Sequence, residues 1–241
     1  MADKSVSLRI DGQLVTVPEG QTVLEAARAL GRQIPTLCYL KGVCSVGSCR
    51  MCMVEQAGAS RLVPACTTPV QEGMSIVTHS PRLAEYRRMN VELLLVERMH
   101  ICSVCVSDGH CELQQLSRDF GVTHVRYAYH HARLPVDMSH PRFVLDHNRC
   151  ILCTRCVRVC NEVEGAQVWE VSSRGVHSRI VCDLKDKWGK AENCTGCGKC
   201  VQACPTGALA EKTTSVHQNA KQSGLIAHLV DQRSKQAAIH H

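Results

Sequence analysis

The first thirty residues carry a pattern of apolar and polar positions that predicts two strands followed by a helix. Residues 5–10 and 13–17 alternate in polarity on either side of Asp11-Gly12, which is typical of a β-hairpin. In residues 21–30 the apolar side chains recur on one face of a helix, and Gly31 stands where such a helix usually ends. We therefore expect the chain to open with an antiparallel hairpin and a helix, ahead of its first cysteine.

A second helix and a second hairpin are predicted farther along the chain. Ser80 is a suitable N-cap, and Pro81 a suitable first residue, for a helix that continues to about Met99. This helix separates two groups of cysteines, so we expect a domain boundary at it. Residues 168–182 alternate in polarity around Arg174-Gly175, which indicates a hairpin.

Two segments lack this periodicity. Residues 124–142 show neither a helical nor a strand repeat, and we expect a linker or an extended packing segment there. After Glu211 the chain becomes polar and rich in Gln, Lys and His, which predicts a mobile tail or a helix that depends on a partner.

The composition indicates metal sites rather than a large apolar core. The 241 residues include 17 cysteines but only 2 Trp, 4 Tyr and 2 Phe, so little aromatic surface can be buried. The opening residues lack the apolar stretch of a secretion signal, and we expect a cytoplasmic protein whose reduced cysteines bind metal. No apolar run reaches the roughly 18 residues of a membrane span, and the net charge of +6 is scattered. We therefore expect no membrane span and no nucleic-acid partner.

The last eight clustered cysteines form an internal repeat that is typical of two-cluster ferredoxins. The spacing C-x2-C-x2-C-x3-C occurs twice. In this pattern three thiolates hold one [4Fe–4S] cluster, while the fourth lies on the next helical turn and holds the other cluster. The expected ligand sets are Cys150, Cys153, Cys156 and Cys204 for one cluster, and Cys160, Cys194, Cys197 and Cys200 for its neighbour. Zinc would need only paired cysteines and would leave the rest unexplained.

Five cysteines between residues 38 and 66 offer two ligand sets for a binuclear cluster. Cys44, Cys49 and Cys52 have the plant-type C-x4-C-x2-C spacing. The alternative is the spacing C-x10-C-x2-C-x13-C, formed by Cys38, Cys49, Cys52 and Cys66. Spacing by itself leaves this choice open.

The stretch MHICSVCVSDGHCELQ lies between these groups and contains Cys102, Cys105 and Cys111. Three thiolates cannot complete a [4Fe–4S] site, so a fourth ligand is needed. His100 and His110 are the candidates, the first upstream of the motif and the second beside its last cysteine. Because imidazole is neutral where thiolate is anionic, such a site should have a raised reduction potential.

The order of these motifs resembles a known family. CYLKGVCSVGSCRMCMVE and LVPACTTPV, followed by the His/Cys stretch and the ferredoxin repeat, resemble the N-terminal region shared by the large peripheral subunit of respiratory complex I, iron-only hydrogenases and the diaphorase part of NAD-reducing hydrogenases. The resemblance implies a [2Fe–2S] cluster on Cys38, Cys49, Cys52 and Cys66. It leaves Cys44 as a buried thiol without a ligand role, and Cys182, which stands alone, is expected to be buried as well.

The same resemblance implies a histidine ligand upstream of C-x2-C-x5-C. The family's usual spacing of three residues falls on Arg98 in this chain, which has H-x-C instead. His100 is therefore the expected ligand, completing a [4Fe–4S] site with Cys102, Cys105 and Cys111. The total becomes one [2Fe–2S] and three [4Fe–4S] clusters.

The resemblance further implies an α+β protein of three cluster-binding domains and a tail. Residues 1–79 would form a β-grasp, plant-ferredoxin-like domain, and residues 80–139 a helical domain with the His/Cys cluster. Residues 140–210 would form a ferredoxin-like domain with two [4Fe–4S] clusters, and residues 211–241 the C-terminal tail.

As a short chain, the protein most resembles the small diaphorase subunit of NAD-reducing, bidirectional [NiFe] hydrogenases. This implies an electron-transfer subunit that relays single electrons between a flavin/NAD-binding diaphorase subunit and the small and large hydrogenase subunits. FMN, NAD and the nickel–iron centre are expected on those partners only. The chain itself has no G-x-G-x-x-G, no P-loop and no catalytic triad, so we expect no substrate-converting site on it.

Other functions stay open at this point. Relay subunits of an NAD-dependent formate dehydrogenase, of an iron-only hydrogenase or of a complex I-like dehydrogenase use the same motifs. A zinc-binding regulatory module is a more distant alternative. Because so much of the fold would depend on bound metal, we expect the chain to fold poorly without iron.

Overall fold

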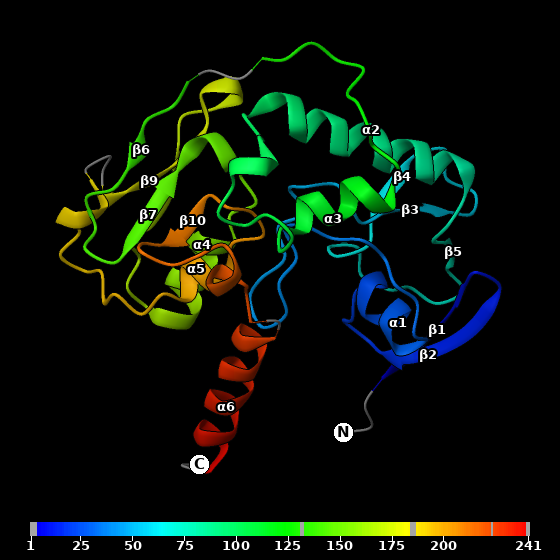
Figure 1. The fold of residues 1–241 in the computed structure, drawn as a ribbon. Helices are drawn as coiled ribbons and strands as arrows, with labels where there is room; N and C mark the ends of the chain where they lie inside the picture. The colour runs from blue at the N-terminus through cyan, green and yellow to red at the C-terminus, as the bar shows by residue number, and fades with distance from the viewer. Residues whose placement is uncertain (1–3, 131–132, 184–186, 223, 240–241) are drawn as a thin grey trace.

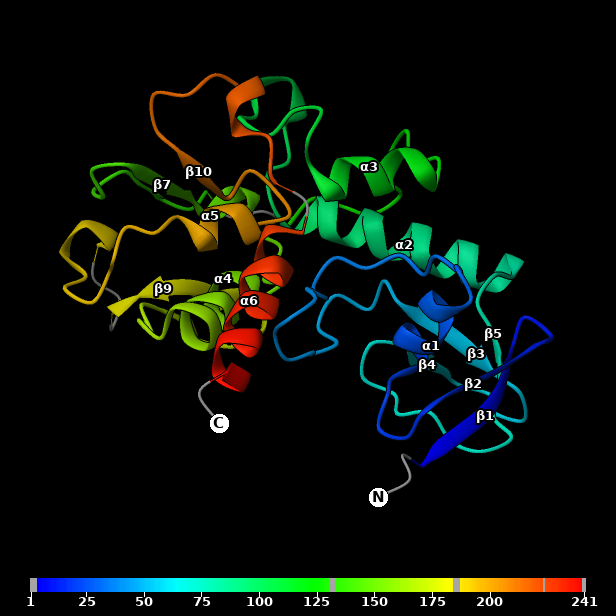
Figure 2. The same ribbon diagram turned by 90° about the horizontal axis from the view of Figure 1, so that it is seen from below.

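The computed structural model describes residues 4–130, 133–183, 187–222 and 224–239. A five-stranded sheet with one helix lies at one end of the molecule, and a lobe that carries two smaller sheets lies at the other. The long helix α2 (Pro81–Glu97) runs between them, as the two views agree (Figure 1 and Figure 2).

The predicted opening hairpin and helix are confirmed. Strands β1 (Ser5–Ile10) and β2 (Gln13–Pro18) pair antiparallel around a tight turn, in which Asp11 and Gly12 both have a left-handed backbone with φ of 48° and 81°. Helix α1 (Val23–Ala29) begins with a capping box and is followed by a left-handed glycine at position 31.

Three short strands complete the N-terminal sheet. They are β3 (Met53–Gln56), β4 (Leu62–Pro64) and β5 (Ser75–Val77), and the strand order is β2-β1-β5-β3-β4. Strand β5 pairs parallel with β1, while the other neighbours are antiparallel. Apolar side chains from β1, β5 and α1 form the core of this end of the molecule, among them Leu8, Ile10, Val23, Leu24 and Ile76.

The predicted second helix is also confirmed. Helix α2 follows the N-cap Ser80, whose hydroxyl accepts a hydrogen bond from the backbone of Leu83 at 3.1 Å. The buried Arg87 of α2 donates to the carbonyls of Met53 and Thr78, which joins the helix to the N-terminal sheet. Helix α3 (Glu112–Asp119) packs against α2 near its C-terminal half (Figure 1).

The second lobe contains two small sheets. Strands β6 (Val136–Asp137), β7 (Phe143–Asp146) and β10 (Leu209–Glu211) form one sheet in the order β10-β7-β6. Strands β8 (Trp169–Ser172) and β9 (Arg179–Cys182) form the predicted hairpin, which is therefore confirmed. Short helices lie between the sheets, namely α4 (Arg155–Arg158), the π-helical continuation at Val159–Glu164, and α5 (Lys199–Ala203).

The predicted linker at residues 124–142 contains only strand β6 within its described part, and residues 131–132 lie outside that part. No helix among the described residues has the length and apolar character needed to cross a membrane.

Of the two alternatives predicted after Glu211, a mobile tail or a helix that depends on a partner, the structure shows a helix. Residues Leu225–Ile239 form helix α6, which leaves the second lobe beside α5 (Figure 1). Ile226 is buried against Val159, Val163 and Ala203 of the chain itself. The structure thus shows a helix in place of a mobile tail, because a few apolar side chains on one face are sufficient to dock a helix whose average composition is polar.

Candidate iron–sulfur centres

Four buried cysteines gather between α2 and the N-terminal sheet. The backbone N–H of Cys38 donates to the sulfur of Cys49 at 3.2 Å, and the sulfurs of Cys52 and Cys66 are 3.3 Å apart. The sulfur of Cys38 also interacts with the side chain of Cys66. All four residues are at most 7% exposed, and they come from the loop before β3 and the turn after β4.

The crowding of these thiols changes their acidity. Hydrogen bonds from the thiols of Cys49 and Cys66 lower the pKa of Cys38, and the same contact with Cys38 raises the pKa of each donor. Four thiolates could not lie together in this buried space without a cation, because each negative charge disfavours the ionisation of the next thiol. The set therefore suits a ferric cluster, whose iron compensates the charge of its ligands.

Cys44 does not lie with this group, and the expectation that it is buried was wrong. It is exposed, its backbone N–H donates to one carboxylate oxygen of Glu162 at 2.8 Å, and its sulfur donates to the other at 2.8 Å. Partial desolvation and the bond to Glu162 raise the pKa of its thiol. Cys44 therefore contacts the second lobe, 118 residues later in the sequence.

Helix α2 holds the loop that carries Cys49. The side-chain amide of Asn90 donates to the carbonyl of Cys49 at 2.7 Å. In the same loop Gly47 has a left-handed backbone with φ of 61°, and a Cβ there would meet Thr67 at 3.3 Å. A glycine is needed because the loop turns sharply against the segment that follows Cys66.

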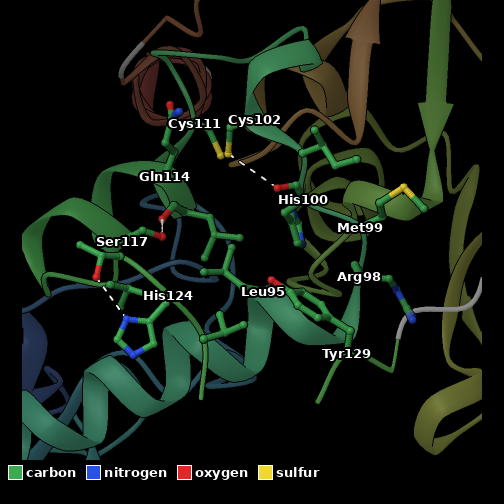
Figure 3. A pocket seen from close by; sticks show the side chains of 15 residues that line it. Leu95, Arg98, Met99, His100, Cys102, Cys111, Gln114, Ser117, His124 and Tyr129 are labelled. Atoms are coloured by element: carbon green, nitrogen blue, oxygen red, sulfur yellow. Dashed lines mark hydrogen bonds between the residues drawn. The ribbon is translucent and has the colours of Figure 1, made fainter. Parts of the chain in front are cut away.

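The His/Cys stretch surrounds a cavity between α3 and the segment after Cys204. His100, Cys102, Cys105 and Cys111 all line it, with Arg149 on the opposite chain segment. A Cβ on Gly207 would lie 2.6 Å from the sulfur of Cys105, so this approach requires a glycine. A larger groove continues from His100, Cys102 and Cys111 to Leu95 and Tyr129 (Figure 3).

The two candidate histidines differ in their surroundings. The Nε2 atom of His100 is buried and has no hydrogen-bond partner among the described residues. Burial, aided by the charges of Arg149 and Arg98, lowers its pKa to about 4, so the ring is neutral at pH 7. His110 is exposed, and its ring packs edge-on against that of His217 at 6.1 Å. A buried, neutral and unpartnered imidazole nitrogen has the properties of a metal ligand.

A second cavity is lined by the first three cysteines of one run and the last cysteine of the other, together with apolar side chains such as Leu145 and Ile180. The four cysteines are Cys150, Cys153, Cys156 and Cys204. Burial raises the pKa of the Cys150 and Cys153 thiols to about 12. These thiols would ionise at pH 7 only with a bound cation, which suits an iron site.

A third cavity has the reciprocal composition. Its cysteines are Cys160, Cys194, Cys197 and Cys200. Three aromatic rings, Phe143, Trp169 and Trp188, line the same cavity, and the indole N–H of Trp188 donates to the sulfur of Cys194 at 3.3 Å. Both tryptophans of the chain and one of its two phenylalanines thus lie at one group of thiols.

The two cysteine runs share an unusual backbone. Leu152 and Thr154 have φ of 53° and 57°, and the corresponding residues of the second run, Gly196 and Gly198, have 66° and 73°. A left-handed backbone is strained in residues that carry a side chain, as Leu152 and Thr154 do. Its occurrence at equivalent positions of the two runs shows that both loops turn in the same way. Such turns direct backbone N–H groups inward, which suits anionic sulfides.

Several residues at these sites were missed by sequence reasoning. Arg158 donates to carbonyls of Cys38 and Cys153, Gly207 makes room for Cys105, and Trp188 bonds to Cys194. The scarcity of tryptophan is the one signal that could have singled out Trp188. The isolated thiol of Cys182 is buried, as expected.

Comparison with protein-family models gives three matches in chain order. Residues 3–81 match a 2Fe-2S iron-sulfur cluster binding domain, and residues 87–126 match the iron-sulfur binding region of NADH-ubiquinone oxidoreductase G. Residues 141–210 match the ferredoxin-like domain of NADH-quinone oxidoreductase subunit 3. The chain is thus a mixed helix-and-sheet protein with a 2Fe-2S domain followed by 4Fe-4S ferredoxin-like regions, and zinc is disfavoured.

Several curated relatives are much longer than this chain. The NADPH-Fe(3+) oxidoreductase subunit alpha of Geobacter sulfurreducens is 42% identical over 207 residues, which are 86% of this chain and 24% of the relative. The NADP-reducing hydrogenase subunit HndD of Solidesulfovibrio fructosivorans is 39% identical over 214 residues, and the match covers 36% of it. The chain therefore spans about a quarter to a third of these relatives.

In two other comparisons, the match covers most of this chain and most of the similar chain. The NAD-reducing hydrogenase HoxS subunit gamma of Cupriavidus necator is 34% identical over 209 residues, which are 86% of this chain and 88% of the relative. A chain in the crystal structure of NAD+-reducing [NiFe]-hydrogenase in the H2-reduced state is 36% identical, with a TM-score of 0.82 over 88% of this chain and 89% of that one. The protein therefore belongs to the family of the gamma subunit of NAD-reducing hydrogenases.

Proposed function

We propose that this chain is the electron-relay subunit of an NAD-reducing [NiFe] hydrogenase, which interconverts H2 and NAD+ with NADH and a proton. The observation that carries the proposal is the set of three cavities, each lined by four donors of one predicted ligand set. Family membership supports it, because the match to the HoxS gamma subunit extends over 88% of that subunit.

The proposed cofactors are one [2Fe–2S] and three [4Fe–4S] clusters. The [2Fe–2S] ligands are Cys38, Cys49, Cys52 and Cys66. The [4Fe–4S] ligand sets are His100 with Cys102, Cys105 and Cys111, then Cys150 with Cys153, Cys156 and Cys204, and finally Cys160 with Cys194, Cys197 and Cys200.

The proposed domains follow the same division. A β-grasp domain at residues 1–79 would hold the [2Fe–2S] cluster, and the parallel pairing of β1 with β5 beside α1 supports that architecture. Residues 80–139 would hold the His/Cys cluster and residues 140–210 the other two. Residues 211–241, expected to be a tail, would instead clamp the first and last domains together through α6.

The bound clusters would supply one-electron chemistry, and the chain would set where and at what potential it occurs. Trp188 stabilises the charged sulfur of Cys194 with a hydrogen bond, which favours the reduced state. The neutral ring of His100 leaves its site one negative charge short of four thiolates, with the same effect. Apolar side chains such as Leu145 and Ile180 exclude water from the second cavity.

Neighbouring sites are joined by shared chain segments. Thr206 lines both the His/Cys cavity and the cavity of Cys150, Cys153, Cys156 and Cys204. Cys153 in turn belongs to the same apolar core as Cys38 and Cys49 of the binuclear site. We infer that electrons pass from one site to the next across these shared chain segments.

We propose three partner subunits: a diaphorase subunit that binds FMN and NAD, and the small and large hydrogenase subunits, of which the large one carries the nickel–iron centre. The similar solved structure is that of an NAD+-reducing [NiFe]-hydrogenase. We also propose a cytoplasmic location, because none of the 17 cysteines forms a disulfide and a reducing compartment keeps cysteines available as metal ligands.

Purification of the intact complex through this chain tests the proposal. Nickel, flavin, iron and acid-labile sulfide should co-purify, and the material should reduce NAD+ with H2. Molybdenum in place of nickel would assign the chain to a formate dehydrogenase. Zinc without sulfide would overturn the electron-relay function altogether.

A further inference from the structure

Arg158 lies between two of the predicted cluster sites. Its side chain is buried at 5% exposure, and it belongs to α4, two residues after Cys156. One guanidinium nitrogen, Nη2, donates to the carbonyl of Cys38 at 2.6 Å and to that of Cys153 at 3.2 Å. The other, Nη1, donates to the carbonyl of Cys44 at 2.5 Å. One side chain thus contacts a ligand residue of the binuclear site and a ligand residue of a tetranuclear site.

The charge of this guanidinium is not paired with a carboxylate of the described residues. Glu162, one turn later, accepts instead from the N–H and thiol of Cys44. Arg155, one turn earlier and equally buried, differs because Glu112 binds it with both carboxylate oxygens. The electric field of a buried cation that is bound only by carbonyl dipoles still acts on neighbouring groups. In an ion pair, the carboxylate cancels most of that field.

A buried unpaired cation costs folding free energy, so its retention calls for a compensating role. Anionic iron–sulfur clusters on the two ligand loops would provide that compensation. Iron–sulfur potentials depend on nearby charge and on hydrogen bonding around the ligands, and Arg158 supplies both at once. Its planar fork also ties together two loops that are 120 and 5 residues away from it in sequence.

We propose that Arg158 is a positioning residue that holds the [2Fe–2S] loop at a set distance from the [4Fe–4S] loop of Cys153 and raises the reduction potentials of both clusters. This inference rests on the proposed cluster assignments. The positive charge of Arg158 raises the two reduction potentials, and the hydrogen bonds of its guanidinium fix the spacing between the clusters. The two effects can therefore be separated by substitution.

The test uses the purified complex with Arg158→Met, Arg158→Lys and Arg87→Gln. Arg87 is the matched control, since it is a buried arginine whose hydrogen bonds within the described part of the chain go to two carbonyls, those of Met53 and Thr78, and both lie on the N-terminal side. Redox titration followed by electron paramagnetic resonance gives each potential. The magnetic interaction between the two reduced clusters reports their spacing.

Arg158→Met should lower both potentials and weaken the magnetic interaction. Arg158→Lys should keep the potentials close to those of the wild type but weaken the interaction, because one ammonium cannot reach all three carbonyls. Arg87→Gln should leave the [4Fe–4S] potential and the interaction unchanged.

Unchanged potentials and interaction in Arg158→Met would overturn the inference, and so would loss of iron in both Arg158 variants, which would assign the residue to folding alone. Wild-type complex without these clusters would instead reject the proposed function. Iron and sulfide contents measured on every sample separate the two failures.

Discussion

At the scale of single residues, the most informative atom is Nε2 of His100. It is buried beside three cysteines and has no partner among the described residues, and burial holds the ring neutral. A buried nitrogen without a hydrogen bond costs about 1–3 kcal/mol unless something else binds it. Coordination to iron would satisfy it, and this distinguishes His100 from the exposed His110.

Exchanging this ligand should change the cluster in a defined direction. His100→Cys should keep the cluster and lower its potential, because an anionic thiolate replaces a neutral ring. His100→Ala should lose about four iron atoms per chain. His110→Ala is the control and should match the wild type in iron content and potential. Iron analysis and redox titration provide both readouts, and a cluster that survives His100→Ala but not His110→Ala would reverse the assignment.

Cys38 and Cys44 should respond differently to the same substitution. Cys44→Ser retains a hydroxyl that can donate to Glu162, so the binuclear signal should persist and stability should change by less than about 1 kcal/mol. Cys38→Ser removes a sulfur from the buried group and should abolish or strongly alter that signal. The electron paramagnetic resonance spectrum of dithionite-reduced protein checks this, and loss of the signal in Cys44→Ser alone would favour the plant-type spacing.

At the scale of elements, helix α6 is docked through a close approach to the loop before β3. Gly42 has φ of 94°, and a Cβ there would lie 3.0 Å from Val230 of α6. Gly58 has a similar backbone, with φ of 78°, but no atom within 4 Å of its Cβ position. Substitution of each of these two glycines therefore distinguishes the effect of backbone strain on stability from the effect of helix docking.

Gly58→Ala should destabilise the protein by about 1 kcal/mol, from left-handed strain alone. Gly42→Ala should cost a further ~1–3 kcal/mol, because Val230 must move. Adding Val230→Ala should recover part of that second loss, since it removes the two crowding methyl groups. Anaerobic thermal unfolding measures the stabilities, and protease cleavage within α6 reports its release. Equal effects of the two glycine substitutions would show that α6 does not pack there in solution.

At the scale of the whole molecule, the two ends depend on metal to different degrees. Among the described residues, the N-terminal core has 16 buried residues, of which two are cysteines, whereas five of the 14 in the main core of the second lobe are cysteines, four of them proposed iron ligands. A core in which thiols bind iron loses much of its stabilisation when the iron is removed, while a core of apolar side chains is retained.

Removal of iron should therefore unfold the molecule unevenly. After treatment with a chelator and reductant, amide hydrogen exchange should rise most in β7, β10 and the short helices of the second lobe. Strands β1 and β2 and helix α1 should keep most of their protection. Uniform loss of protection would mean that the N-terminal sheet also needs its cluster, and unchanged protection everywhere would contradict a metal-dependent fold.

Much of the fold follows from short-range patterns. The hairpin at Asp11-Gly12, the helix after Ser80 and the hairpin of β8 and β9 were all predictable, because alternation, capping and turn chemistry act within a few residues. The grouping of thiols from the two C-x2-C-x2-C-x3-C runs was also predicted, since the spacing within each run fixes which thiols can face the same side. The structure brings these thiols into two cavities.

The sequence by itself thus determined the local elements and the reciprocal pattern of the cysteine runs. Tertiary structure alone decided that Cys44 turns to Glu162, that Arg158 joins the loops of Cys38 and Cys153, and that α6 packs on the chain itself. The physical reason is distance along the chain. Contacts between segments that are distant in sequence, such as the 118 residues between Cys44 and Glu162, depend on how whole elements pack, and no spacing rule within one segment encodes them.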